Sequence, residues 1–115
     1  MPRVLRHLKH NGILGILADE THSLQPIVVS FFGIPSQTAP GAAKLHLRYR
    51  TPIVFCFSVK QNDGRYLLSF DGPHHFRKSV DLRKDCEYIM SQINKKYEEI
   101  IKKYPDQWFC LLQAG

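Results

Sequence analysis

The most regular hydrophobic pattern in the chain lies between residues 82 and 104. Apolar side chains recur there every three or four residues, which predicts an amphipathic helix with one buried face. Asp81 precedes the segment as an N-cap and Pro105 follows it, so residue types that begin and end helices flank it on both sides. The predicted inward stripe is Leu82, Cys86, Ile89, Met90, Ile93, Tyr97, Ile100, Ile101 and Tyr104.

Two shorter helices are predicted in the first half of the chain. Residues 4–8 place apolar side chains at helical spacing among basic ones, and the Asn-Gly pair at 11–12 ends that pattern. A second helix begins at Pro40, with Thr38 or Ser36 as its cap. Both helices present basic residues on their polar faces.

Four apolar segments have the character of strands. Residues 13–18 form a continuous apolar run that ends at Asp19, which is typical of a strand buried on both faces. Residues 27–32 predict a second strand. A Gln-Asn-Asp-Gly turn joins two further segments, 53–59 and 66–70, which predicts a β-hairpin. The order of helices and strands predicts an α/β protein with a layered arrangement.

The composition is that of an ordinary folded protein of one domain. The chain has 115 residues, of which 43% are hydrophobic and 23% charged. The net charge of +6 is uneven, because residues 1–60 carry seven Lys and Arg against only two acids, Asp19 and Glu20. A basic half of this kind fits nucleic acid, phosphorylated substrates or an anionic membrane surface, and charge alone does not choose among them.

The cysteine, histidine and hydropathy patterns argue against a metal site and a transmembrane segment. The three cysteines are far apart and have no metal-ligand spacing, which favours a reducing compartment. His74 and His75 are adjacent without a third ligand nearby in sequence, so no metal site is predicted. No apolar stretch approaches the roughly 18 to 20 residues that cross a bilayer, so no transmembrane segment is expected.

Three stretches, taken together, carry a family resemblance. The first is Gly-Ile-Leu-Ala-Asp-Glu at 15–20. The second runs from Phe-Phe-Gly at 31–33 through a Gly-Ala-Ala helix start to Pro-Ile-Val at 52–54, and the third is Pro-Asp-Gln-Trp-Phe at 105–109. Their order and spacing resemble the late (secondary) acyltransferases of lipid A biosynthesis. The likeness covers nearly the whole chain and corresponds to the C-terminal portion of that family.

The resemblance implies a fold and a reaction. The expected fold is a partial glycerolipid-acyltransferase-like layered sheet with flanking helices, formed by residues 1–115 as a single partial domain. The family transfers a fatty acyl group from acyl carrier protein to a hydroxyl of a lipid A precursor, and because the thioester is already activated, no metal or organic cofactor is expected. The implied location is the cytoplasmic face of the bacterial inner membrane.

One part of the family pattern is missing. The family uses a His-x-x-x-x-Asp/Glu motif, whose histidine acts as general base on the acceptor hydroxyl. No histidine of this chain has an acid five residues after it; the six are His7, His10, His22, His46, His74 and His75. We therefore expect the chain alone to be inactive. It is expected to be a fragment, a split gene product whose N-terminal half is on another chain, or a decayed copy.

The resemblance and the residue types together suggest candidate site residues. Asp19 matches the end of a family strand, where it is a candidate supporting acid and substrate-binding residue. Phe31, Phe32 and Gly33 are candidates for the wall of an acyl-chain pocket, with core packing as the alternative. Arg48 and its basic neighbours are candidates to bind precursor phosphates or an anionic membrane, with a solvated helix face as the alternative.

A different class of function stays open at this point. A small basic module could contact nucleic acid or acidic partners through the helix at residues 3–9. The sequence does not interleave aromatic and basic residues as base-stacking surfaces do, and the family resemblance implies no nucleic-acid partner. A catalytically dead remnant is a third alternative.

Overall fold

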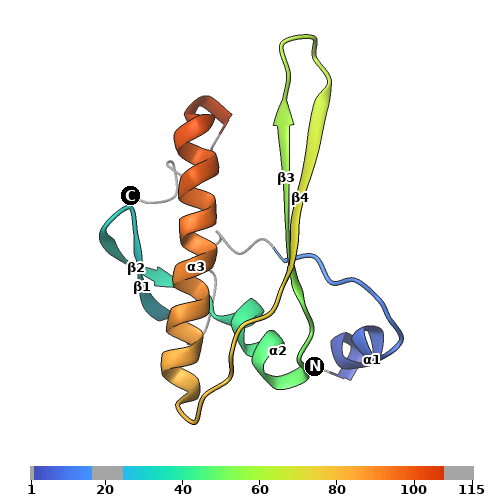
Figure 1. Cartoon of the computed structure of the whole chain (residues 1–115), viewed down its shortest axis with the longest axis vertical. Helices are drawn as coiled ribbons and strands as arrows, with labels where there is room; N and C mark the ends of the chain where they lie inside the picture. Colours follow the sequence, from blue (N-terminus) through green and yellow to red (C-terminus); the bar gives the residue numbers. More distant parts are fainter. Residues whose placement is uncertain (1, 17–24, 108–115) are drawn as a thin grey trace.

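The computed structural model of the chain describes residues 2–16 and 25–107, and this part forms three α-helices, a short 3-10 helix and two separate antiparallel hairpins (Figure 1). The predicted α/β class is therefore confirmed as a mixed α/β fold. Its strands pair only within each hairpin. The elements are α1 (Pro2–Lys9), β1 (Ile27–Phe31), β2 (Ile34–Thr38), α2 (Gly41–Tyr49), β3 (Ile53–Lys60), β4 (Tyr66–His74), α3 (Leu82–Lys103) and η1 (Pro105–Gln107).

Helix α3 is the longest element, and β1, α2 and η1 all pack against it (Figure 1). The helix predicted between residues 82 and 104 is confirmed. The Asp81 carboxylate accepts a hydrogen bond from the Lys84 backbone N–H at 3.2 Å, as expected of an N-cap. Leu82, predicted to face inward, is instead 52% exposed because it lies in the first turn. The buried side chains of α3 are Cys86, Ile89, Met90, Ile93, Asn94 and Ile101.

Helix α2 packs against α3 through its small and aliphatic residues. Ala43 and Leu47 are buried in the same cluster as the α3 stripe. The predicted cap is wrong, because the helix starts after Pro40 without a side-chain cap hydrogen bond. Thr38 and Ser36 lie in strand β2, where each hydroxyl donates to a backbone carbonyl two residues earlier. Both residues thus belong to the strand rather than to the first turn of the helix.

The segment predicted as one strand over 27–32 is the first half of a hairpin. Phe31 pairs with Ile34 across a two-residue turn in which Phe32 and Gly33 both have positive φ, 51° and 76°. Such turns match the twist of the flanking strands. The second strand, β2, contains Pro35, a residue that argues against a strand when only the sequence is known. Both strands of a two-stranded sheet are edge strands, and edge strands tolerate proline.

The second predicted hairpin, β3–β4, is confirmed and is longer than expected. Figure 1 shows it rising beside α3. Ile53 and Phe55 of β3 pack against the core cluster that α3 helps to form, and Phe57 and Asp71 contact α3 further along the hairpin. The Phe57 ring meets the Tyr97 ring edge-on at 5.7 Å, and the Asp71 carboxylate is 2.8 Å from the Lys96 ammonium.

The first predicted helix is confirmed, whereas the strand predicted to follow it is wrong where it is described. Helix α1 ends with the Gly12 N–H donating to the His7 carbonyl at 2.8 Å. Residues 13–16 then form no strand, and Ile13, at 89% exposed, and Ile16, at 43%, face solvent. A strand buried on both faces needs neighbouring strands and covering layers. In the described part of the chain, β1 pairs with β2 and β3 pairs with β4, so no strand pairs with residues 13–16.

Candidate functional site

The Phe-Phe-Gly turn is fixed to the C-terminal half of α3. The rings of Phe31 and Phe32 stack with centroids 4.9 Å apart, and the Phe32 backbone N–H donates to the Glu98 carboxylate. The Lys102 ammonium lies 6.0 Å from the Phe32 ring centroid. At Gly33 the space for a side chain is open, so the glycine is required by its positive φ rather than by a close neighbour.

The other predicted site residues lie apart from this turn. Asp19 lies outside the described residues, so its role stays a prediction. Arg48 is exposed on α2, with its guanidinium 5.5 Å from the centroid of the Tyr49 ring. The turn and Arg48 belong to two elements that both pack on α3.

A hollow with basic walls lies between the end of α2 and the loop that joins β4 to α3. Its volume is about 910 Å³, and it is lined by Arg50, Arg77, Lys78, Ser79 and Val80. Among the ion pairs of residues 2–16 and 25–107, none involves the three cations of this hollow. The Asp85 carboxylate binds Ser79 in the wall of this hollow, so it offsets part of the charge of the three cations, and the net positive charge that remains suits an anion.

Buried His46 holds the two sides of this hollow together. Its Nδ1 lies 2.6 Å from the Thr51 carbonyl oxygen, and its Nε2 accepts a hydrogen bond from the Phe76 backbone N–H at 3.0 Å. An Nε2 that accepts carries no proton, so the neutral ring donates from Nδ1 to Thr51. The Arg50 N–H also donates to the His46 carbonyl at 2.8 Å. Both ring nitrogens are thus used to fix the backbone.

A histidine and an acid do approach each other on β4. His74 Nε2 lies 3.3 Å from an Asp71 oxygen but is buried and forms no hydrogen bond with the described residues. The other Asp71 oxygen binds the Lys96 ammonium, and this hydrogen bond, more than any other contact, lowers the pKa of Asp71 and raises that of Lys96. The family motif has its acid five residues after the histidine, whereas Asp71 lies three residues before His74, so this pair was not predicted from the sequence.

Comparison with known proteins decides the family. The model of the bacterial lipid A biosynthesis acyltransferase family matches residues 1–114. The chain belongs to this family. No curated protein and no solved structure matches the chain. The resemblance read from the sequence is thereby confirmed.

The third stretch that resembles the acyltransferase family has a visible structural role. In η1, the Gln107 side-chain amide spans the backbone of Lys60 on β3. Its Oε1 accepts from the Lys60 N–H at 2.8 Å and its Nε2 donates to the Lys60 carbonyl at 3.1 Å. Trp108 and Phe109 lie outside the described residues. The glutamine of this acyltransferase signature therefore attaches the end of α3 to the hairpin.

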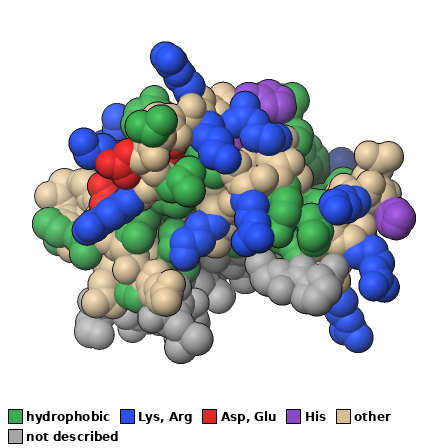
Figure 2. Space-filling view, turned by 90° about the horizontal axis from the view of Figure 1, so that it is seen from below, with side chains coloured by type: hydrophobic (Ala, Val, Ile, Leu, Met, Phe, Trp, Pro, Cys, Tyr) green, Lys and Arg blue, Asp and Glu red, His purple; other side chains and the backbone are tan. Residues whose placement is uncertain are grey.

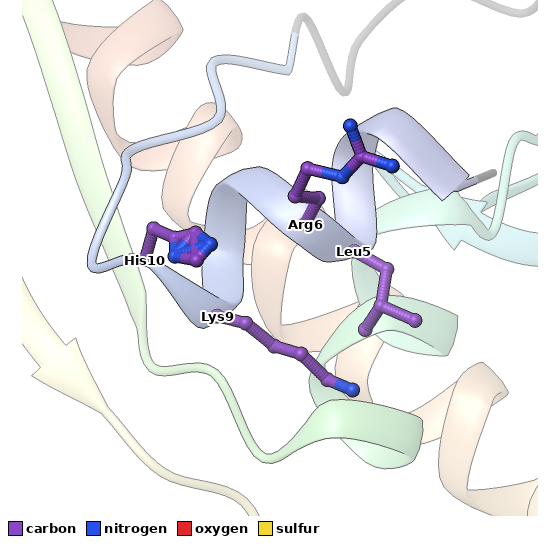
Figure 3. A pocket seen from close by; sticks show the side chains of 4 residues that line it. All are labelled: Leu5, Arg6, Lys9 and His10. Carbon is purple, nitrogen blue, oxygen red and sulfur yellow. The ribbon is translucent and has the colours of Figure 1, made fainter.

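The N-terminal helix of this acyltransferase-family chain carries a second, smaller hollow. It is lined by Leu5, Arg6, Lys9 and His10 and has a volume of about 290 Å³. Figure 3 shows that Arg6 and Lys9 point to opposite sides of α1, so their charges do not converge on one point. This hollow is a basic helix surface rather than a site with directed chemistry.

The described residues, 2–16 and 25–107, offer neither a metal-binding cluster nor a membrane-spanning helix. No three His, Cys, Asp or Glu side chains gather there so that they could hold a metal ion. In the same part of the chain, no helix combines the length and the hydrophobicity that are needed to cross a bilayer.

Proposed function

We propose that this chain is a lipid A biosynthesis acyltransferase-like protein that does not transfer acyl groups by itself. The family match over residues 1–114 is the observation that carries the first half of the proposal. The corresponding reaction moves a fatty acyl group from acyl carrier protein to a hydroxyl of a lipid A precursor. The site would lie at the cytoplasmic face of the bacterial inner membrane, and Asp19 would be its supporting acid.

The histidines carry the second half of the proposal. A general base must accept a proton from the acceptor hydroxyl, and therefore needs an available ring nitrogen and an acid that orients it. Both nitrogens of His46 are bound to backbone groups. His74 faces Asp71, but Lys96 holds that carboxylate. A second chain that supplies the histidine and its acid would be needed to complete the site.

The substrate-binding roles remain proposals for particular side chains. The stacked rings of Phe31 and Phe32, with Gly33 beside them, offer apolar surface to a fatty acyl chain. Arg48 presents an exposed guanidinium to a precursor phosphate. These assignments make the chain a substrate-binding part of an acyltransferase.

An acyl-transfer assay tests the proposal. The purified chain is incubated with an acyl-acyl carrier protein and a lipid A precursor in detergent, and products are followed by mass spectrometry. We expect no more acylated product than in a reaction without protein. Product that forms with the chain and disappears with His74→Ala would contradict the proposal, because it would identify a working base.

A further inference from the structure

The loop between β4 and α3 exposes apolar side chains among cations. Val80 is fully exposed, and Leu82 is about half exposed. Basic pairs lie on both sides, at residues 77–78 and 83–84. Single exposed aliphatic side chains are common on soluble proteins, and these two differ from the others in having basic pairs on both sides.

Two carboxylates also lie at this surface, Asp81 at the cap of α3 and Asp85 in its first turn, and they offset part of its positive charge. Asp81 caps α3, and Asp85 accepts hydrogen bonds from the backbone N–H and the hydroxyl of Ser79 at 2.7 and 2.8 Å. Arg50 adds a further cation from the end of α2. We call Arg50, Arg77, Lys78, Val80 and Leu82 the basic loop surface. Figure 2, which looks at this end of the molecule, shows Lys and Arg side chains gathered around hydrophobic ones.

The basic loop surface is preformed by the fold. His46 binds the backbone of Phe76, just before Arg77, and the two rings meet edge-on at 5.6 Å. Arg50 is fixed by its own hydrogen bond to the His46 carbonyl. Since His46 anchors both backbone segments, the cations from α2 and from the loop are brought together before any partner binds.

We propose that the basic loop surface docks onto an anionic lipid bilayer, with Val80 and Leu82 entering the headgroup region while Arg50, Arg77 and Lys78 contact lipid phosphates. Charge complementarity supplies the attraction, since each basic residue near an anionic leaflet strengthens binding roughly fivefold. The exposed aliphatic residues favour a bilayer over nucleic acid or free phosphate, because neither offers them an apolar environment. The proposal depends on this surface alone and stands or falls independently of acyl transfer.

Cosedimentation with vesicles tests the cations first. We expect the chain to bind vesicles of phosphatidylcholine with phosphatidylglycerol, and not vesicles of phosphatidylcholine alone. The triple variant Arg50→Gln/Arg77→Gln/Lys78→Gln should bind on the order of a hundredfold more weakly. The matched control Lys60→Gln/Lys95→Gln/Lys103→Gln removes equal charge from exposed sites outside the surface and should change affinity only a few fold. Equal losses in the two triple variants would overturn the proposal.

The apolar contact is tested next. Val80→Ser should weaken vesicle binding roughly tenfold, because the valine leaves water on docking. Ile34→Ser makes the same kind of change at an exposed aliphatic side chain on β2, outside the basic loop surface, and should have no effect. Circular dichroism confirms that each variant is folded. The proposal is overturned if Val80→Ser binds vesicles as well as the parent chain does, or if inorganic phosphate alone displaces the chain from the vesicles. It is also overturned if duplex DNA binds the parent chain as tightly as the vesicles do and binds Val80→Ser equally well.

Discussion

Apolar side chains recur regularly in both the α2–α3–β1 core and the β3–β4 hairpin, but those of the core are buried whereas those of β4 are mostly exposed. In the core, Ile89 and Met90 are at most 1% exposed, and α2 and β1 both pack against α3. A polar contact adds to this packing, because the amide of Asn94 donates to the Ser30 carbonyl at 3.1 Å. The core is closed by elements from three parts of the chain.

In the hairpin the regular pattern faces outward. Tyr66, Leu68 and Phe70 alternate along β4 as a half-buried strand would, yet they are 65%, 58% and 69% exposed. The opposite face is partly covered: Val59 is 7% exposed, Ile53 and Phe55 pack against the core cluster, and Phe57 and Asp71 contact α3. An alternating pattern therefore specifies a strand without specifying what covers its apolar face. Burial is decided by partners elsewhere in the chain.

Truncating one side chain in each region should separate them most strongly. Ile89→Ala removes buried methyl and methylene groups and leaves a cavity, so we expect a loss of about 2–5 kcal/mol in the free energy of unfolding. Leu68→Ala removes an exposed side chain and should change it by less than about 0.5 kcal/mol. Urea unfolding followed by circular dichroism measures both. Similar losses would contradict the contrast between a closed core and an open hairpin.

A smaller, pH-dependent effect is expected where the regions meet. The hydrogen bond from Lys96 is the main cause that lowers the pKa of Asp71. A lowered acid pKa stabilises the fold above the ordinary Asp value, about 3.9, and that stabilisation is lost as pH falls through the lowered pKa. Asp71→Asn should therefore lower Tm at pH 7 and make little difference at pH 2.

Thermal unfolding of the parent chain and of Asp71→Asn, each at pH 7 and at pH 2, checks this expectation. Asp106→Asn is the control for the change in charge, because Asp106 is exposed in η1 and takes no part in the Asp71–Lys96 contact. A Tm difference for Asp71→Asn that is the same at pH 7 and pH 2 would show that the ion pair is not its cause.

Elements with strong local signals were predictable. The stripe of α3 with its cap Asp81, and the turn of the second hairpin, both depend on residues near one another in sequence. Strand β2 was missed because Pro35 argues against a strand wherever its place in the sheet is unknown. The strand predicted over 13–18 needed partners that only the three-dimensional arrangement could show to be missing from the described part.

The candidate site was predictable only where the family resemblance named it. Phe31 and Phe32 were singled out and do stack, although their role in binding an acyl chain stays a prediction. Arg50 was predicted, as a basic neighbour of Arg48, to meet phosphates or an anionic membrane, but its place beside Arg77 was not, because the two residues are distant in sequence. A buried histidine that bonds two backbone segments has no signature in a single sequence.

The contrast between the two regions is tested most directly by the rate at which their cysteines react with a thiol reagent. In a Cys110→Ser background, Cys56 on the exposed face of β3 is compared with Cys86 in the core, where burial is the main cause that raises the pKa of the thiol. The thiolate is the reactive form, so burial slows Cys86 both by excluding the reagent and by keeping the thiol protonated. We predict rapid labelling of Cys56 and labelling of Cys86 only in denaturant. Equal rates in the native protein would contradict the account.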